Sequence, residues 1–545
     1  MNPEEMTAAL NAMLEQGNQL RASKLVPVLT NVTGKFNVLE DIMGITLDPD
    51  LDEKCYKYFT IEATENGTKV YFRQSSYAVS DGLNPLKVEI STNNGKTWTE
   101  VTAAPAKDDV PGAVLVELAK GNKVFIRGKN EAYGYYSNNA SEGVNNCNFF
   151  ANAPCFVYGN IMSLVGGDDF ARLRKVKDCA FAYFFANYNA ALDGSWVLSK
   201  EKEELLLPAT TLADYCYNSM FSGCTNLTTA PTLPATTLTY HCYNSMFYGC
   251  TNLTVAPTIS AITLADYCCY HMFDSCTSLT AAPELPATML ADYCYNFMFK
   301  NCTSLAIAPA LPATTLTDSC YSYMFDGCTS LAAAPVILPA TMLADYCYNY
   351  MFQNCTNLTT APTLPATTLT DHCYSSMFKG CTSLTVAPAL PATTLANYCY
   401  NSMFSGCTNL TIAPTILPAT TLASSCYESM FNGCTSLIAA PTLPATTLAN
   451  SCYYYMFSGC TNLTIAPELP ATTLASSCYS SMFYGCTNLS RIKAMFTTTP
   501  GSSYTNNWVK NVKDTGTFVK NSAATWNVSG NTGVPTGWTV ETASN

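Results

Sequence analysis

The feature that most constrains this sequence is an internal repeat of 26 or 27 residues. A Met-Phe pair recurs at this spacing from Met220 to Met482, and the first unit, beginning at Leu207, reads LPATTLADYCYNSMFSGCTNLTTAPT. Two units carry one extra residue, in each case between their two prolines, as in the segment Pro335–Pro339, so that point is predicted to be a loop. Eleven units at one period predict a solenoid, in which each unit packs mainly on its neighbours.

Within each unit the apolar residues first recur every four positions and then stop at a proline. The four-residue spacing predicts one buried stripe of a short helix. The position of Gly223 holds only Gly, Asn or Ser in other units, as expected of a left-handed residue that ends a helix. A brief strand is predicted to follow and to end at Pro231, which lacks the N–H donor of a ladder. The predicted stripe of the first unit comprises Leu212, Cys216, Met220 and Cys224.

This combination predicts the shape of the array. Packed helices lie about 8–10 Å apart, whereas paired strands lie about 4.8 Å apart. An array with helices on one side and strands on the other therefore has to bend, with the strands inside. We expect a gently curved arc or superhelix.

Columns of equivalent residues separate a uniform interior from a variable outer face. Met and Phe recur in every unit and Tyr217 in ten of eleven, so these columns are predicted to form the core. At 100° per residue, four columns face away from the methionine, and their residues differ between units. These outward columns begin at Tyr215, Asn218, Ser219 and Ser222.

Aromatic residues gather in the middle of this outer face. Three successive units place an aromatic residue in the Ser219 column, and at helix spacing these rings would form a strip about 20 Å long. The strip fits a ligand-binding patch, since aromatic rings bury large area with little loss of entropy, or a ridge stiffened by stacking. The candidate ligand-binding residues are Tyr293, Phe297, Tyr323, Tyr346 and Tyr350.

The chain has 27 cysteines, and each unit holds a pair eight residues apart, such as Cys216 and Cys224. On a helix these two would lie about 12 Å apart, beyond the limit of about 7 Å between the Cα atoms of a disulfide. Zinc is disfavoured because the spacing is not a usual ligand spacing and no histidine accompanies it. We expect free thiols, buried as small hydrophobic groups in stacked columns.

Charge and histidine content argue against several classes of function. The net charge of −12 disfavours nucleic acid and anionic membranes as partners. The sequence contains no run of 18 apolar residues, so no membrane-spanning segment is predicted. The only histidines, at positions 241, 271 and 372, are expected on the surface. An aspartate column from Asp266 to Asp371 either stabilises helix N-termini or forms a cation ladder. No catalytic residue, metal site or cofactor is predicted.

The flanking segments follow other patterns. Residues 4–22 predict an amphipathic helix, and period-two alternation with Asn94-Gly95 as a hairpin signal predicts a small β-sandwich. The first residues, MNPEEM, lack the basic and apolar regions of a secretory signal, so export by that route is not expected. The predicted multidomain organisation is 1–46 N-terminal docking or oligomerisation segment, 47–137 β-sandwich, 138–204 degenerate N-terminal cap, 205–489 elongated α/β solenoid and 490–545 C-terminal capping module.

The repeated pattern Met-Phe-x-Gly-Cys-Thr-Asn/Ser-Leu, followed by a proline-containing stretch, resembles the BspA-type (Treponema-type) leucine-rich repeats. The resemblance covers residues 205–489, and the tail with Trp508, Trp526 and Trp538 is similar to modules that follow such repeats in gut Bacteroidales proteins. This family implies adhesion or recognition at surfaces, without catalysis.

Two settings fit such a protein. The first is a phage virion fibre or receptor-binding protein, assembled in the bacterial cytoplasm and attaching to the bacterial host surface. Its partners would be a host surface glycan or protein receptor and, through the N-terminal segment, other virion proteins. By analogy with such fibres, a homo-oligomer, in particular a trimer, is expected. The alternative is a leucine-rich-repeat adhesin on the bacterial cell surface.

Overall fold

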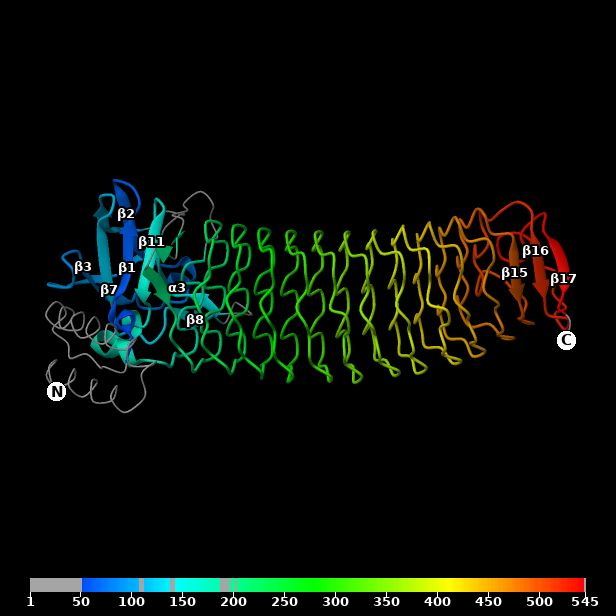
Figure 1. Ribbon diagram of the computed structural model, residues 1–545, viewed down its shortest axis with the longest axis horizontal. Helices are drawn as coiled ribbons and strands as arrows, with labels where there is room; N and C mark the ends of the chain where they lie inside the picture. Colours follow the sequence, from blue (N-terminus) through cyan, green and yellow to red (C-terminus); the bar gives the residue numbers. More distant parts are fainter. Residues whose placement is uncertain are drawn as a thin grey trace, which may run out of the picture.

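The computed structural model describes residues 51–106, 112–137, 143–186, 196–197, 199–200 and 203–543. These residues form an elongated rod with a β-sheet domain at its N-terminal end, a long stack of coils, and a short sheet at its C-terminal end (Figure 1). The predicted helix at residues 4–22 lies outside the described residues. No helix of the described part has the length and hydropathy of a membrane-spanning segment.

Two sheets build most of the N-terminal domain, and Phe59 of the larger contacts Phe149 of the smaller, with ring centroids 5.9 Å apart. The larger runs in the order β13-β14-β11-β1-β7-β3-β4, with β12 beside β11, and the smaller runs β10-β2-β5, with β6 beside β2. The strands of the larger sheet are β1 (Phe59–Ala63), β3 (Lys87–Ser91), β4 (Thr99–Thr102), β7 (Lys123–Arg127), β11 (Cys155–Asn160), β12 (Trp196–Val197), β13 (Ser199–Lys200) and β14 (Glu203–Leu206). Those of the smaller sheet are β2 (Thr68–Gln74), β5 (Ala104–Pro105), β6 (Val114–Leu118) and β10 (Cys147–Ala151). The remaining elements of this domain are β8 (Gly134–Tyr136), β9 (Gly143–Asn145), α3 (Ser76–Ser80), α4 (Ser163–Gly166) and the 3-10 helices η1 (Glu53–Tyr56) and η2 (Gly167–Arg172).

The hairpin predicted at Asn94-Gly95 is confirmed. Strands β3 and β4 pair antiparallel with Ile90 opposite Thr99. Asn94 and Gly95 have φ angles of 59° and 80°, as a two-residue turn with left-handed central residues requires.

The predicted boundary at residue 137 is wrong. Strands β10 and β11, which fall in the segment assigned to a cap, pair with β2 and β1 and complete the two sheets. The repeat-like chain begins later, where the N–H groups of Phe181 and Phe185 donate to the carbonyls of Cys216 and Met220. Residues 175–186 therefore form an incomplete first coil between the sheets and the repeats.

The helix predicted in each unit is also wrong, because residues 213–224 and their equivalents form a chain of tight turns. We call this stretch the turn segment. Tyr215, Ser219 and Gly223 have φ angles of 56°, 51° and 74°, and an α-helix cannot contain a left-handed residue at every fourth position. The left-handed conformation predicted for the Gly223 column is confirmed. The residues four and eight positions before it, in the columns of Ser219 and Tyr215, are left-handed as well.

Hydrogen bonds between coils replace those of a helix. Along the turn segment, alternate N–H groups donate to the next coil, as from Tyr217 to Cys242 at 3.1 Å and from Phe221 to Met246 at 2.9 Å. The predicted strand is reduced to isolated parallel bridges, such as Thr229 with Val255. Both sides of a coil thus stack at strand-like spacing, and the rod is nearly straight rather than the expected arc (Figure 1).

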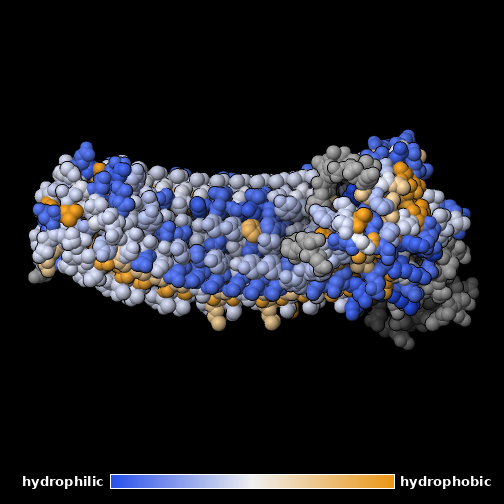
Figure 2. All heavy atoms as spheres, turned by 180° about the vertical axis from the view of Figure 1, so that it is seen from behind, coloured by the Kyte–Doolittle hydropathy of each residue, from blue (hydrophilic) through white to orange (hydrophobic). Residues whose placement is uncertain are grey.

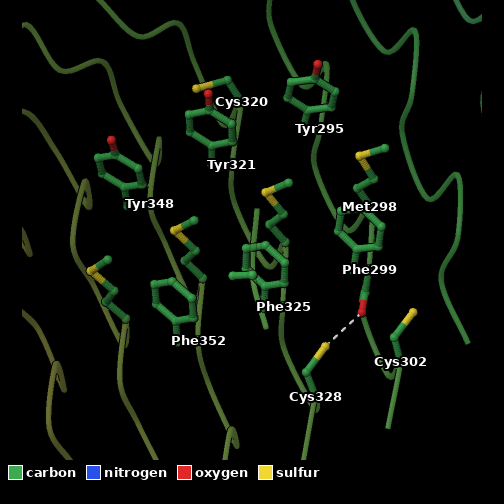
Figure 3. Packing of buried hydrophobic residues seen from close by; sticks show 14 of the residues in the cluster. Tyr295, Met298, Phe299, Cys302, Cys320, Tyr321, Phe325, Cys328, Tyr348 and Phe352 are labelled. Carbon is green, nitrogen blue, oxygen red and sulfur yellow. Dashed lines mark hydrogen bonds between the residues drawn. The ribbon is translucent and has the colours of Figure 1, made fainter. Parts of the chain in front are cut away.

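The core consists of columns that run along the rod. Rings of the Tyr217 and Phe221 columns are buried and stacked, for example Phe299 on Phe325 at 5.6 Å, as predicted (Figure 3). All 27 cysteines are buried and free, which confirms the thiol prediction. The second cysteine of a unit bonds the preceding coil, as where Cys328 Sγ donates to the Phe299 carbonyl at 3.0 Å (Figure 3).

Three tryptophans close the C-terminal end. Trp508 is fully buried beside the last Phe of the core, and its Nε1 donates to the Gly533 carbonyl. Trp526 and Trp538 likewise donate to backbone carbonyls. A parallel three-stranded sheet covers the last coil and comprises β15 (Arg491–Ala494), β16 (Thr517–Lys520) and β17 (Thr539–Thr542).

Candidate functional site

Two columns of left-handed residues on the turn segments carry the variable aromatic side chains. The first aromatic column is the Tyr215 column, and its members include Tyr293, Ser319, Tyr346, His372 and Tyr398. The second aromatic column is the Ser219 column, and its aromatic run is His271, Phe297, Tyr323 and Tyr350. All of these residues have φ angles between 52° and 58°, so their side chains leave the backbone in the same way.

The rings of each column stack face to face. In the second column the centroids of Phe297 and Tyr323 lie 4.6 Å apart, and those of Tyr323 and Tyr350 lie 4.5 Å apart. In the first column, Tyr346, His372 and Tyr398 are spaced by 4.6 Å and lie within 8° of parallel. Because the steps are strand-like, the expected strip length of about 20 Å is wrong, and the strip is roughly half as long.

A shallow groove of about 530 Å³ lies between the two columns. Its aromatic walls include all five candidate binding residues together with His372 and Tyr398. Polar residues of the Asn218 column, together with the serine of the first aromatic column, complete the lining. These polar residues are Asn296, Ser319, Ser322, Asn349, Ser375 and Asn401.

The groove is nearly uncharged. Burial lowers the pKa of His372, which favours its neutral form, and raises the pKa of Tyr323 to about 12. At the rim, Lys300 Nζ lies 5.0 Å from the ring centroid of Phe297 and 3.7 Å from Asp326. Neutral amides, hydroxyls and aromatic faces can bind a neutral ligand with hydroxyl groups, and they do not form a nucleophile–base arrangement.

The comparison with protein families decides what kind of chain this is. The model of the BspA type leucine rich repeat region, which has six copies of the repeat, matches residues 206–331, 292–438 and 397–518. These matches span more than half of the chain. The chain belongs to the BspA-type leucine-rich repeat family. The family is one of non-enzymatic repeat proteins.

Two solved structures are similar to this BspA-type protein. A leucine rich cell surface protein from Faecalibacterium prausnitzii A2-165 is 16% identical with a TM-score of 0.34, covering 62% of this chain and 82% of its own. The pneumococcal vaccine antigen PcpA is 11% identical with a TM-score of 0.26, covering 78% of this chain and 82% of its own. No curated protein matches the sequence of this BspA-type chain.

The expectation of outward columns in this BspA-type repeat is wrong for its first unit, where Tyr215, Ser219 and Ser222 are only 3%, 4% and 7% exposed. The Asn218 column was placed on the outer face by helical geometry, but Asn218 is fully buried and Asn296 is 4% exposed. Within the groove, Asn296, Asn349 and Asn401 of this column form the floor rather than the rim. His372 and Tyr398 also line the groove, although neither is among the five candidate residues. Both share the column of Tyr346, so the column pattern that singled out Tyr346 applies to Tyr398 directly and to His372 once histidine is grouped with tyrosine.

The prediction that all three histidines lie on the surface is wrong. His241 is buried between Tyr215 and Tyr267, with both ring centroids at 4.7 Å, and burial lowers its pKa to about 4. The Nδ1 atom of His271 lies 2.6 Å from the Oδ2 atom of Asp274. In the first aromatic column, histidine therefore serves as a flat ring equivalent to tyrosine.

The aspartate column links successive coils. The Oδ1 atom of Asp292 accepts the N–H of Asp318 at 3.1 Å, and Asp318 does the same for Asp345 at 3.2 Å. The carboxylates thus stabilise backbone donors, although between coils rather than at helix ends. Within the described ranges, no group of three or more histidine, cysteine or acidic residues could hold a metal ion.

Proposed function

We propose that this protein is a non-enzymatic adhesion and recognition protein that binds its target through the groove between the two aromatic columns. The observation that carries this proposal is the concentration of aromatic rings in one stretch of an otherwise regular rod. The same two columns carry serine in later units, as at Ser402 and Ser425, so the fold itself does not require the rings. Stacked, partly exposed rings over a polar floor are typical of a recognition surface.

The finer proposal is a fibre or receptor-binding protein of a phage virion. Twenty-seven reduced, buried cysteines suit a protein that folds in the reducing bacterial cytoplasm, where virions assemble. The alternative setting is the bacterial cell surface, and the same groove would face outward there. Antibody labelling of purified phage particles and of intact bacteria in electron micrographs separates the two, since a virion protein labels particles.

Replacement of Phe297, Tyr323 and Tyr350 together by serine tests the groove. Serine occupies this column elsewhere with the same left-handed backbone, so the melting temperature should change little. Binding to cells of a Bacteroidales panel should fall tenfold or more, which corresponds to about 1.4 kcal/mol. The measurement is a cell-binding isotherm with labelled protein.

The matched control for this experiment is Tyr455→Ser. Tyr455 lies in the second aromatic column but outside the groove, so its replacement should leave cell binding unchanged. If the triple variant binds cells as the parent protein does, the groove is not the recognition surface and the proposal is wrong.

A further inference from the structure

The first aromatic column lacks one ring in the middle of the groove. Rings stack without interruption from Tyr215 through His241 and Tyr267 to Tyr293, and again from Tyr346 onward. The coil between these runs carries Ser319 in the same column. The faces of Tyr293 and Tyr346 on either side of Ser319 are therefore not covered by a neighbouring ring of the column.

The backbone holds this gap at a defined width. Tyr293, Ser319 and Tyr346 have φ angles of 57°, 54° and 57°. Each donates its N–H to the same position of the next coil, at 3.0, 2.9 and 3.0 Å. Two strand-like steps separate the two tyrosines, so their rings lie about 9–10 Å apart. A six-membered ring in van der Waals contact with both faces requires about 7–8 Å, so the gap is wide enough for one ring with about 1–2 Å to spare.

Polar groups form the floor beneath the gap. Asn296 Nδ2 donates to the Ser319 carbonyl at 3.2 Å, and Ser322 Oγ donates to the Asn349 carbonyl at 3.1 Å. Asn296 is 4% exposed, and its Oδ1 atom has no hydrogen-bond partner among the described residues. A buried amide oxygen without a partner is unfavourable, so a ligand hydroxyl that reaches this atom and donates to it would be favoured.

We infer that the gap at Ser319 is a subsite for one pyranose ring of a neutral glycan, which completes the aromatic stack. This inference rests on the proposed recognition function and names the ligand class. A pyranose presents apolar C–H faces to the two tyrosines and hydroxyl groups to the asparagine and serine floor. An aromatic side chain of a protein partner would stack equally well but would leave the Oδ1 atom of Asn296 without a donor. An acidic glycan finds no lysine or arginine in the lining, and Lys300 at the rim lies 3.7 Å from Asp326, which offsets its charge.

Ser319→Tyr tests the subsite by filling it from within the protein. Tyrosine occupies this column at Tyr293 with the same φ, so the variant should fold and keep its melting temperature. The probe is an array of neutral oligosaccharides of glucose, galactose, mannose and xylose, with sialylated and uronic acid glycans beside them. The parent protein should bind at least one neutral glycan, and Ser319→Tyr should weaken that binding tenfold or more.

Ser425→Tyr is the matched control, because it adds a tyrosine to the same column beyond Tyr398 and outside the groove, and it should bind as the parent does. The subsite is refuted if Ser319→Tyr binds neutral glycans normally, or if the parent binds none at millimolar concentration. Cell binding that is lost in the Phe297, Tyr323 and Tyr350 triple variant but retained in Ser319→Tyr rejects the subsite and keeps the recognition function. Retention in the triple variant rejects the recognition function itself.

Discussion

Residues with positive φ angles determine where the groove between the two aromatic columns lies. Ser402 has a φ of 54°, and its N–H donates to the Glu428 carbonyl in the next coil at 2.8 Å. Such a conformation costs of order 1–3 kcal/mol for a residue other than glycine and persists where surrounding bonds hold it. The sequence signalled this backbone only in the Gly223 column, because glycine and asparagine favour it. Tyrosine, phenylalanine and serine gave no such signal in the other two columns, so a helix was predicted.

Substitution of Ser402 tests the left-handed backbone directly. Ser402→Val should lower the free energy of unfolding by about 1–3 kcal/mol, because a β-branched residue fits this region poorly. Ser402→Asn, the control, should be nearly neutral, since asparagine tolerates the conformation. In a helix the three residues have similar propensities, so equal stabilities would contradict the turn geometry. Urea unfolding curves of the three proteins provide the measurement.

At the scale of the element, the turn segment replaces the predicted helix while keeping its four-residue spacing. The buried stripe, the core tyrosines and the free thiols were therefore predicted correctly from column patterns, although the backbone was not. The five candidate residues were found because their columns vary between units. The floor was missed, since 100° per residue turns the Asn218 column outward, whereas the chain of turns buries Asn296 and Asn349.

The cysteine columns predict loss of stability at alkaline pH. Burial raises the pKa of Cys216, Cys320 and Cys373 to about 12, whereas unfolded thiols release their protons near pH 9. Between about pH 9 and 12 the folded chain binds more protons than the unfolded chain. The free energy of unfolding should therefore fall by about 1.4 kcal/mol per pH unit for each such thiol. Urea midpoints at pH 8, 9 and 10 measure this fall.

Cys320→Ala is the control for the alkaline effect, because tyrosines also titrate in this range. The variant should show a shallower dependence by the contribution of one thiol. A urea midpoint that is unchanged from pH 8 to pH 10 would mean that the thiols are accessible in the folded protein.

At the scale of the whole molecule, the spacing between coils decides the shape. The rings of the Phe221 and Phe247 pair lie 5.4 Å apart in the core, and those of the aromatic columns 4.3–4.7 Å apart. The solenoid could be predicted from the repeat alone, whereas the N-terminal cap assigned to 138–204 could not, because β10 and β11 in that segment belong to the two sheets. The curvature could not be predicted, because the expected arc assumed helices that pack about 8–10 Å apart in successive units. With strand-like spacing on both sides of a coil, neither side is longer, and the array extends nearly straight (Figure 1).

A narrow band of hydrophobic surface follows one edge of this rod (Figure 2). The bridge column that begins at Thr229 contributes exposed β-branched residues at intervals, among them Val255, Ile307, Val386, Ile412 and Ile465. Their column lies on the bridge side of the coil, apart from the turn segments that carry the groove. An excision of whole units beyond Asn401 therefore shortens the hydrophobic band but leaves the groove intact.

Excision of residues 404–456 removes two units and joins Met403 to Phe457, which preserves the repeat register. At strand-like spacing the rod should shorten by about 10 Å, whereas helix packing would shorten it by about 16–20 Å. The maximum dimension from small-angle X-ray scattering distinguishes these values. All lining residues of the groove remain, so cell binding should equal that of the parent protein. A shortened rod that still folds but no longer binds would place part of the recognition surface in the excised units, beyond the aromatic columns.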